Sequence, residues 1–383
     1  MRGLRKERSG YRGLRPGVLI PGLLAALAVS AALAGCSARS PGPAAGSAQG
    51  SAPGTAAGTA WLQLQSGSFQ PVTDPGAAAS VARRPWTVQS RVADMAFFDG
   101  ILYCGVNGSG LAAMTRDAAG KISFDYHPDP LIFGHRTITT LVPRQGTLAV
   151  HVYFNALLND ARQQDLSLGG ISLVSYSPQK SDYSFLIPPF QRMNPDWEAV
   201  GFATESENSF DLEWKYTDAS ETRFQYTRFH ADTKVEEPAD RDTFLSALGV
   251  PAIEGPSVPS NLASFFASCR SEMPALSPGA SLQFSLRSRE SPVRRNYRSR
   301  KESETAVAVP MFEEEGGLLA LLPDGRVLSA GSGGTPRALA LPRMPAGFHY
   351  TDFVKWGASL IVSWEEISFT DVGRAGLLVY PFS

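Results

Sequence analysis

Short apolar runs separated by tight, glycine-containing turns recur along most of the chain. The repeated unit consists of an apolar strand, a turn, a second apolar strand, a polar gap and a third strand. Four copies are regular, and they span residues 94–114, 140–177, 309–331 and 351–382. Short apolar runs bounded by turn signals are typical of β-strands. The pattern therefore predicts an all-β protein built from repeated antiparallel units.

Two less regular copies lie in the middle of the chain. One is WEAVGFATESENSFDLEWKY (197–216), followed by ETRFQYTRFH, and the other surrounds Gly279, with SLQFSLRSR after it. Six units with a period of roughly 40–50 residues predict a β-propeller-like body of six or seven blades. A β-sandwich or an irregular all-β domain would show similar strand lengths and is the alternative prediction.

The two ends of this region indicate how the blades close. The chain ends on GLLVYPFS, which is typical of the third strand of a last blade, and strand-like sequence begins at Trp61 with WLQLQSGSFQPV. Because unpaired sheet edges invite aggregation, we expect the segment from Trp61 to pair with the last strand. Residues 61–383 are therefore predicted to form a single propeller-like domain.

A short helical insertion is predicted around residues 242–269. Leu262, Phe265, Phe266 and Cys269 recur at the spacing of one helix face. Asp242 or Ser257 could cap the helices, and Pro259 suits a first turn. The apolar face must cover another apolar surface, either as a packed insertion or as a lid.

The first 35 residues have a different character. They begin with a basic leader and continue with an almost wholly apolar run from Val18 to Leu33, which is short for a membrane-spanning helix of about 20 residues. Leu33-Ala34-Gly35-Cys36 follows. This order resembles the signal peptide and lipobox of bacterial lipoproteins. The resemblance implies export, cleavage before Cys36 and lipid on its sulfur; a transmembrane anchor or a non-lipidated signal peptide is the alternative.

Residues 36–60 follow the lipobox with a sequence of Ala, Gly, Ser and Pro that contains no large apolar side chain. Such a segment cannot bury enough surface to offset chain entropy, so we expect a disordered tether. Ser37 stands where an Asp would favour retention in the inner membrane. The outer membrane is therefore favoured where the cell has one, with the periplasmic or surface orientation left open.

Composition excludes one class of partner. The leader holds six of the 35 basic residues and one of the 36 acidic ones, so the rest of the chain is net acidic and no nucleic-acid partner is expected. Cys104 and Cys269 could form a disulfide in an oxidising compartment, but two buried free thiols are the favoured prediction.

One segment departs from this acidic character, namely RSRESPVRRNYRSRK (287–301). Arginine side chains grip carboxylates and phosphates in pairs, so the segment indicates an anionic protein, glycan or lipid headgroup as partner. A solvated loop neutralised by nearby acids is the alternative. The candidate residues are Arg287, Arg289, Arg294, Arg295, Tyr297, Arg298, Arg300 and Lys301.

No catalytic or metal motif stands out. The five histidines lie apart from one another and from the cysteines, so no metal site or cofactor is expected. The pair Glu365-Glu366 could serve acid–base chemistry, although such pairs are usually solvated. Propeller ligands usually sit at the channel mouth, near the starts of the innermost strands. The residues there are Asp94, His135, Arg136, Trp197, Thr351 and Asp352.

These observations favour a lipid-anchored cell-envelope protein whose propeller-like body binds or scaffolds a partner without catalysis. The body is similar to uncharacterised propeller-like envelope lipoproteins, and its sequence points to no specific family. Whether the protein is an enzyme stays open. The alternatives are a propeller-fold hydrolase or lyase acting on envelope glycans, and a structural factor in envelope assembly.

Overall fold

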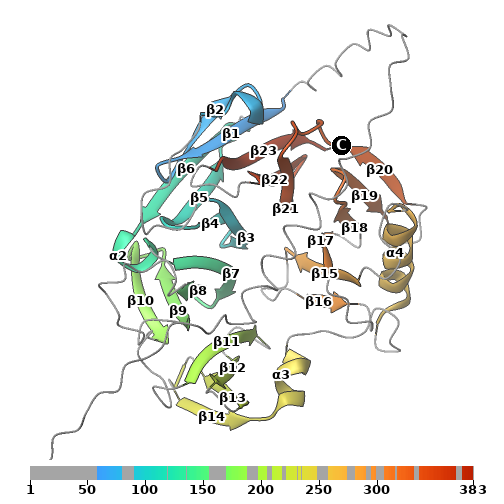
Figure 1. Cartoon of the computed structure of the whole chain (residues 1–383). Helices are drawn as coiled ribbons and strands as arrows, with labels where there is room; N and C mark the ends of the chain where they lie inside the picture. The colour runs from blue at the N-terminus through green and yellow to red at the C-terminus, as the bar shows by residue number, and fades with distance from the viewer. Residues whose placement is uncertain are drawn as a thin grey trace, which may run out of the picture. The chain divides into compact units, whose positions relative to one another are not determined.

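The protein is described from a computed structural model (Figure 1). The described residues are 58–79, 90–118, 120–134, 136–154, 170–187, 197–204, 209–217, 221–230, 232–233, 235–247, 258–273, 281–289, 295–298, 306–314, 317–331, 336–367 and 373–382. The chain divides into two compact units, Met1–Ala45 and Gly46–Ser383, and every described residue belongs to the second. The predicted lipobox at Cys36 and the residues of the tether up to 57 lie outside the described residues.

Small sheets, most of them antiparallel throughout, make up the body. The first contains β3 (Val92–Phe98), β4 (Ile101–Val106), β5 (Gly110–Arg116) and β6 (Ile122–Pro128). The second contains β7 (Arg136–Arg144), β8 (Thr147–Phe154), β9 (Gly170–Ser177) and β10 (Asp182–Ile187). The third contains β11 (Trp197–Thr204), β12 (Ser209–Thr217), β13 (Thr222–His230) and β14 (Val235–Ala239). In each, neighbouring strands in the chain are neighbours in the sheet.

The last two sheets are larger. One has the order β16 (Arg295–Arg298), β15 (Ser281–Ser288), β17 (Ala306–Glu314), β18 (Gly317–Leu321), β19 (Arg326–Ala330) and β20 (Arg337–Ala340). The other has the order β2 (Ser68–Val72), β1 (Ala60–Gln65), β23 (Ala375–Pro381), β22 (Ser359–Glu366) and β21 (Phe348–Trp356). The first strands of the sheets lie toward the interior of this unit (Figure 1).

The sheets pack face to face in sequence. One hydrophobic cluster joins sheet β11–β14 to sheet β7–β10, and a second joins sheet β7–β10 to sheet β3–β6. A third joins sheet β3–β6 to the strands β21–β23 and to β17–β19. Repeated four-stranded meanders that bury their faces only against their neighbours form a β-propeller-like body. The predicted all-β, propeller-like class is thereby confirmed.

The blade number differs from the prediction, because the described residues form five sheets rather than six or seven. The unit expected around Gly279 does not make a sheet of its own. Its strand β15 pairs in parallel with β17, the first strand of the next unit, and so extends that sheet inward. A sequence repeat counts strands and turns, and it cannot show that two units share one sheet.

The predicted closure of the two chain ends is confirmed. Strand β1 pairs antiparallel with β23, with Trp61 opposite Leu378. The backbone of β1 approaches Gly376 so closely that a Cβ there would collide with the carbonyl oxygen of Leu62. Trp61 also meets the ring of Trp364 edge-on, with ring centroids 6.3 Å apart. The N-terminal hairpin is therefore part of the core.

Three helices interrupt the strands: α2 (Pro130–Phe133), α3 (Arg241–Ala247) and α4 (Ser260–Ser271). The predicted apolar face of the insertion is confirmed, because Leu262, Phe265, Phe266 and Cys269 are all buried against sheet β15–β20. The predicted caps are wrong. Asp240 caps α3 through the amide of Thr243, at 2.7 Å, and α4 begins after Pro259 with no side-chain cap. No helix in the described part of the chain is long and apolar enough to span a membrane.

Candidate functional site

The first strands of four sheets carry a β-bulge at equivalent positions. The register shifts between Val92 and Asp94 in β3, and between Tyr350 and Asp352 in β21. Corresponding shifts occur in β7 and β11. A bulge re-aims the side chain that follows it. The residue after the bulge is an aspartate in β3 and in β21, so two sheets present a carboxylate at the same point.

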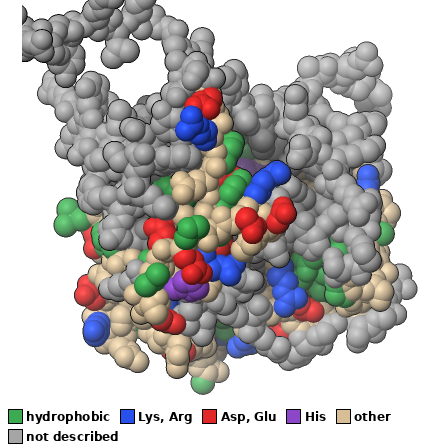
Figure 2. All heavy atoms as spheres, turned by 90° about the horizontal axis from the view of Figure 1, so that it is seen from below, with side chains coloured by type: hydrophobic (Ala, Val, Ile, Leu, Met, Phe, Trp, Pro, Cys, Tyr) green, Lys and Arg blue, Asp and Glu red, His purple; other side chains and the backbone are tan. Residues whose placement is uncertain are grey.

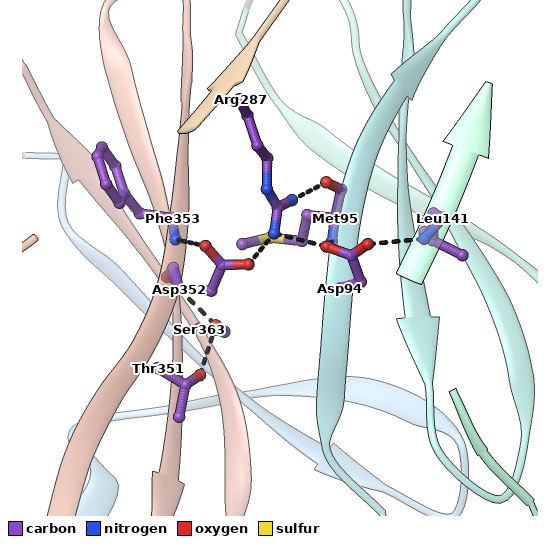
Figure 3. Close-up of polar contacts among 8 residues, drawn as sticks. All are labelled: Asp94, Met95, Leu141, Arg287, Thr351, Asp352, Phe353 and Ser363. Carbon is purple, nitrogen blue, oxygen red and sulfur yellow. Dashed lines mark hydrogen bonds and ion pairs between the residues drawn. The ribbon is translucent and has the colours of Figure 1, made fainter. Parts of the chain in front are cut away.

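Both carboxylates meet the guanidinium of Arg287, which β15 brings between them (Figure 3). Nη2 of Arg287 lies 2.5 Å from Oδ1 of Asp94 and also donates to Oδ2 of Asp352. Nη1 donates to the carbonyl oxygen of Met95. We call Asp94, Arg287 and Asp352 the aspartate–arginine cluster. It joins three sheets through their inner strands.

The backbone satisfies the remaining carboxylate oxygens. The amide of Leu141 in β7 donates to Oδ2 of Asp94 at 2.6 Å, so the cluster reaches a fourth sheet. Each aspartate also accepts a hydrogen bond from the amide of the next residue, Met95 or Phe353, at 2.9 Å. Charged groups removed from water need such partners. The cluster is therefore built as a hydrogen-bonded network.

Burial sets the electrostatics of the cluster. Asp94 is 2 % exposed, and Asp352 and Arg287 are each 9 % exposed. Loss of hydration raises the pKa of both carboxyl groups, and the positive charge of Arg287 offsets only part of that rise. Burial opposes the charge of Arg287, but the two carboxylates outweigh it and raise the guanidinium pKa. Each aspartate also raises the cost of ionising the other when both are charged.

This geometry suits cohesion better than chemistry. A general acid or base must reach a substrate proton within hydrogen-bonding distance. Here the carboxylates are buried and bonded to one guanidinium, whose strand belongs to the core through Phe284 and Leu286. The cluster can hold strands β3, β15 and β21 together in one arrangement.

A more exposed group of charges lies at the same ends of β21 and β22. Glu365 accepts contacts from Nε2 of His349 at 3.3 Å and from Nη1 of Arg91 at 3.6 Å. We call these three residues the rim cluster. Between it and the aspartate–arginine cluster, the hydroxyls of Thr351 and Ser363 are 2.7 Å apart (Figure 3). Sequence analysis treated Glu365 as a solvated carboxylate and missed Arg91, which lies outside the repeats.

The predicted channel-mouth residues are only partly brought together. Asp94, Thr351 and Asp352 lie in the region just described. Arg136 instead donates to the carbonyl oxygen of Leu131 at 3.2 Å and lies over the ring of Phe185. Trp197 begins β11, opposite Tyr216, and the structure places it no further. His135 lies outside the described residues.

The predicted basic patch is wrong at two positions. Arg287 is not a surface residue but the buried centre of the aspartate–arginine cluster. Tyr297 is also buried, with its ring centroid 5.2 Å from that of Phe266. Alternation along β15 and β16 explains both, because every second side chain of a strand turns to the same face.

The other positions of that segment are partly described. Arg289 and Arg295 are exposed, and Arg289 lies over the ring of Phe97 while contacting Glu314 at 3.5 Å. Arg298 lies in β16. Arg294, Arg300 and Lys301 fall outside the described residues. On the face of the body shown in Figure 2, basic and acidic groups among the coloured residues lie interspersed.

The described residues contain no group of three or more His, Cys, Asp or Glu side chains placed to hold a metal ion. Cys104 and Cys269 are buried free thiols, as the sequence favoured. Burial raises the pKa of each thiol to about 12, which makes both poor nucleophiles.

Comparison with known proteins assigns the chain to a family. The model of a family of unknown function, DUF8086, matches residues 51–383, and the chain belongs to this family. No curated protein sequence matches the chain.

Three solved structures illustrate the similarity of the fold. Endo-arabinase from Bacteroides thetaiotaomicron is 12% identical, with 79% of this chain and 98% of that chain covered and a TM-score of 0.33. A sialidase from Trypanosoma rangeli is 10% identical, with 82% and 56% covered and a TM-score of 0.31. The calcium-binding protein regucalcin from Agrobacterium tumefaciens is 12% identical, with 85% and 90% covered and a TM-score of 0.25.

Proposed function

We propose that this member of family DUF8086 is an exported protein, anchored by lipid on Cys36, whose propeller-like body binds a partner in the cell envelope without catalysis. The observation that carries the non-catalytic part is the occupation of Asp94 and Asp352 by Arg287. The two inner-strand carboxylates best placed for acid–base work are engaged with an internal cation and shielded from substrate. A body of repeated blades offers broad surfaces for binding instead.

The anchor is proposed from the sequence Leu33-Ala34-Gly35-Cys36 behind its basic and apolar leader. Growth with an alkyne-tagged palmitate, followed by fluorophore coupling, tests it directly. Wild-type protein is expected to carry the label and to sediment with membranes. Cys36→Ser is expected to lose the label and to retain the uncleaved leader. A labelled Cys36→Ser protein would refute the proposed acylation site.

The binding role is tested by crosslinking the tagged protein in cells and identifying the species that co-purify. A specific envelope protein or glycan is expected. A parallel strain in which Arg294, Arg295 and Arg298 are changed to Ser asks whether the basic segment makes the contact. The outer membrane, where present, is the expected location. A partner needed for assembly of the envelope would assign the structural role within this proposal.

One observation favours a second function, that of a hydrolase or lyase acting on envelope glycans. Because two carboxylates share one guanidinium nitrogen, they lie close together, as the pair of a retaining glycosidase does at about 5 Å. Release of reducing sugars from envelope polysaccharides by the wild type, abolished in both Asp94→Asn and Asp352→Asn, would establish this function. Equal release by wild type and variants would assign the activity to a contaminant.

A further inference from the structure

The rim cluster is assembled from distant parts of the chain. Arg91 precedes β3, His349 lies near the start of β21 and Glu365 near the end of β22. His349 and Glu365 are directly paired across the two antiparallel strands. Arg91 is fixed through its backbone, because its carbonyl oxygen accepts a hydrogen bond from the amide of Asn107 at 3.0 Å. Two sheets thus hold the three side chains in place.

The three side chains differ in how far they reach solvent. Glu365 is 18% exposed, His349 is 34% exposed and Arg91 is 44% exposed. Glu365 is therefore the base of the group, and the two nitrogen-bearing side chains stand above it. Burial opposes ionisation of Glu365, but hydrogen bonds and charge from His349 and Arg91 outweigh burial and lower its pKa. The carboxylate is consequently charged at neutral pH.

Arg91 is held but not saturated. A guanidinium has five N–H donors in a rigid fork. Among the residues that the structure describes, its ion pair is with Glu365, through Nη1 at 3.6 Å. The rest of the fork is presented at the exposed side of the cluster. An arginine positioned by one carboxylate, with donors left over, is prepared to grip a second anion.

Arg374, on the same edge, shows what a saturated arginine looks like here. Its Nη2 and Nε donate to the two oxygens of Glu366 at 2.7 and 2.9 Å. The guanidinium also lies over the ring of Phe348, 4.6 Å from the centroid. Its fork is already used on a carboxylate of the chain itself. Arg374 is therefore a matched comparison for Arg91.

We propose that the rim cluster binds the carboxylate and a neighbouring hydroxyl of an acidic sugar, with Arg91 holding the carboxylate, Glu365 accepting from the hydroxyl and His349 completing the contact. A donor fork beside a charged acceptor matches a ligand that carries an anion and a hydroxyl on adjacent atoms. This inference rests on the proposed binding role in the envelope, and it names the ligand class and the place of contact.

The test uses full-length protein in detergent micelles and methyl β-D-glucuronide, titrated by ligand-observed NMR. Methyl β-D-glucoside, which has the same hydroxyls without the carboxylate, is the matched neutral probe. Arg91→Gln and Glu365→Gln remove the two main contacts, and Arg374→Gln is the matched control. Because Arg91 is largely exposed, its substitution leaves the fold intact, which a thermal melt verifies.

The glucuronide is expected to bind, and the glucoside at least tenfold more weakly. Arg91→Gln is expected to lower affinity about tenfold, the equivalent of one charge-assisted hydrogen bond, while Arg374→Gln leaves it unchanged. Equal binding of both sugars, no binding of either, or equal losses in Arg91→Gln and Arg374→Gln would each overturn the inference. A partner captured equally by wild type and Arg91→Gln in cells would sustain the binding role while rejecting this site.

Discussion

Nη2 of Arg287 lies 2.5 Å from Oδ1 of Asp94, although the two residues come from different sheets. The same nitrogen serves Asp352, and Asp94 also accepts the amide of Leu141. Four sheets are thus connected through one buried network. Its effect is to hold the inner strands in register, and the proposed function follows from that use of the two carboxylates.

The pH dependence of stability should report the buried carboxylates. Burial raises the pKa of Asp352 above its ordinary value of 3.8, with Arg287 and Asp94 facing it. A carboxyl group with a raised pKa in the folded state contributes stability that is full below its unfolded pKa and is lost as the pH rises through its folded pKa. Asp352→Asn removes this titration. The free energy of unfolding of the variant, relative to wild type, should therefore rise from pH 4 toward neutrality.

Denaturant titrations of both proteins at several pH values measure this difference. Only the slope of the difference with pH is used, because the substitution also changes a hydrogen bond. Other carboxylates, such as Glu365 with its lowered pKa, titrate in both proteins and cancel. A difference that falls as the pH rises would contradict the raised pKa.

The closure by β1 should depend on Gly376. A Cβ at this position would collide with the carbonyl oxygen of Leu62 and press on the ring of Trp364. Gly376→Ala is expected to cost about 1–3 kcal/mol, as overpacking does. Gly331→Ala is the control, since nothing lies within 4 Å of a Cβ there. Urea unfolding measures both, and equal stabilities would show that β1 does not pack as described.

The face of α4 should contribute strongly to stability. The ring of Phe266 is 1% exposed and stacks on Phe284, with ring centroids 4.4 Å apart. Phe266→Ala is expected to cost about 3–5 kcal/mol, because a large cavity would form in a packed core. Ser264→Ala, on the exposed face of the same helix, should change the free energy of unfolding by less than about 0.5 kcal/mol. A mobile lid would instead give a small loss for both substitutions.

The two cysteines of the body should be unreactive until the protein unfolds. Cys104 and Cys269 are fully buried, and burial raises the pKa of each thiol to about 12. In a Cys36→Ser protein, Ellman's reagent should find no thiol in the native state and both in guanidinium chloride. Fewer than two thiols after unfolding without reductant would point to a disulfide.

The strand pattern of the body could be predicted because each repeat is local. Alternating apolar residues and glycine turns determined the strands, and the exposed edge of the last blade required a partner, which β1 supplies. The parallel pairing of β15 with β17 could not be predicted, because it joins two units through the backbone and leaves no mark on the pattern of either.

The candidate sites show the same division. Asp94 and Asp352 occupy equivalent places in the first and last repeats, so the sequence could indicate them as a pair. Arg287 looked like part of a basic surface, because its burial depends on how a distant strand enters the interior. Arg91 gave no signal, since its role comes from contact with Glu365 across two sheets.

The unfolding free energy of Arg287→Met tests most directly whether Asp94 and Asp352 serve to hold the sheets together. Removing the cation leaves two buried carboxylates uncompensated, so a loss of about 3–5 kcal/mol is expected. Changing both aspartates to Asn in the same protein should recover much of that loss, because no buried charge then remains in the cluster. Wild-type stability in Arg287→Met, or no recovery in the triple variant, would contradict the structural role of the cluster.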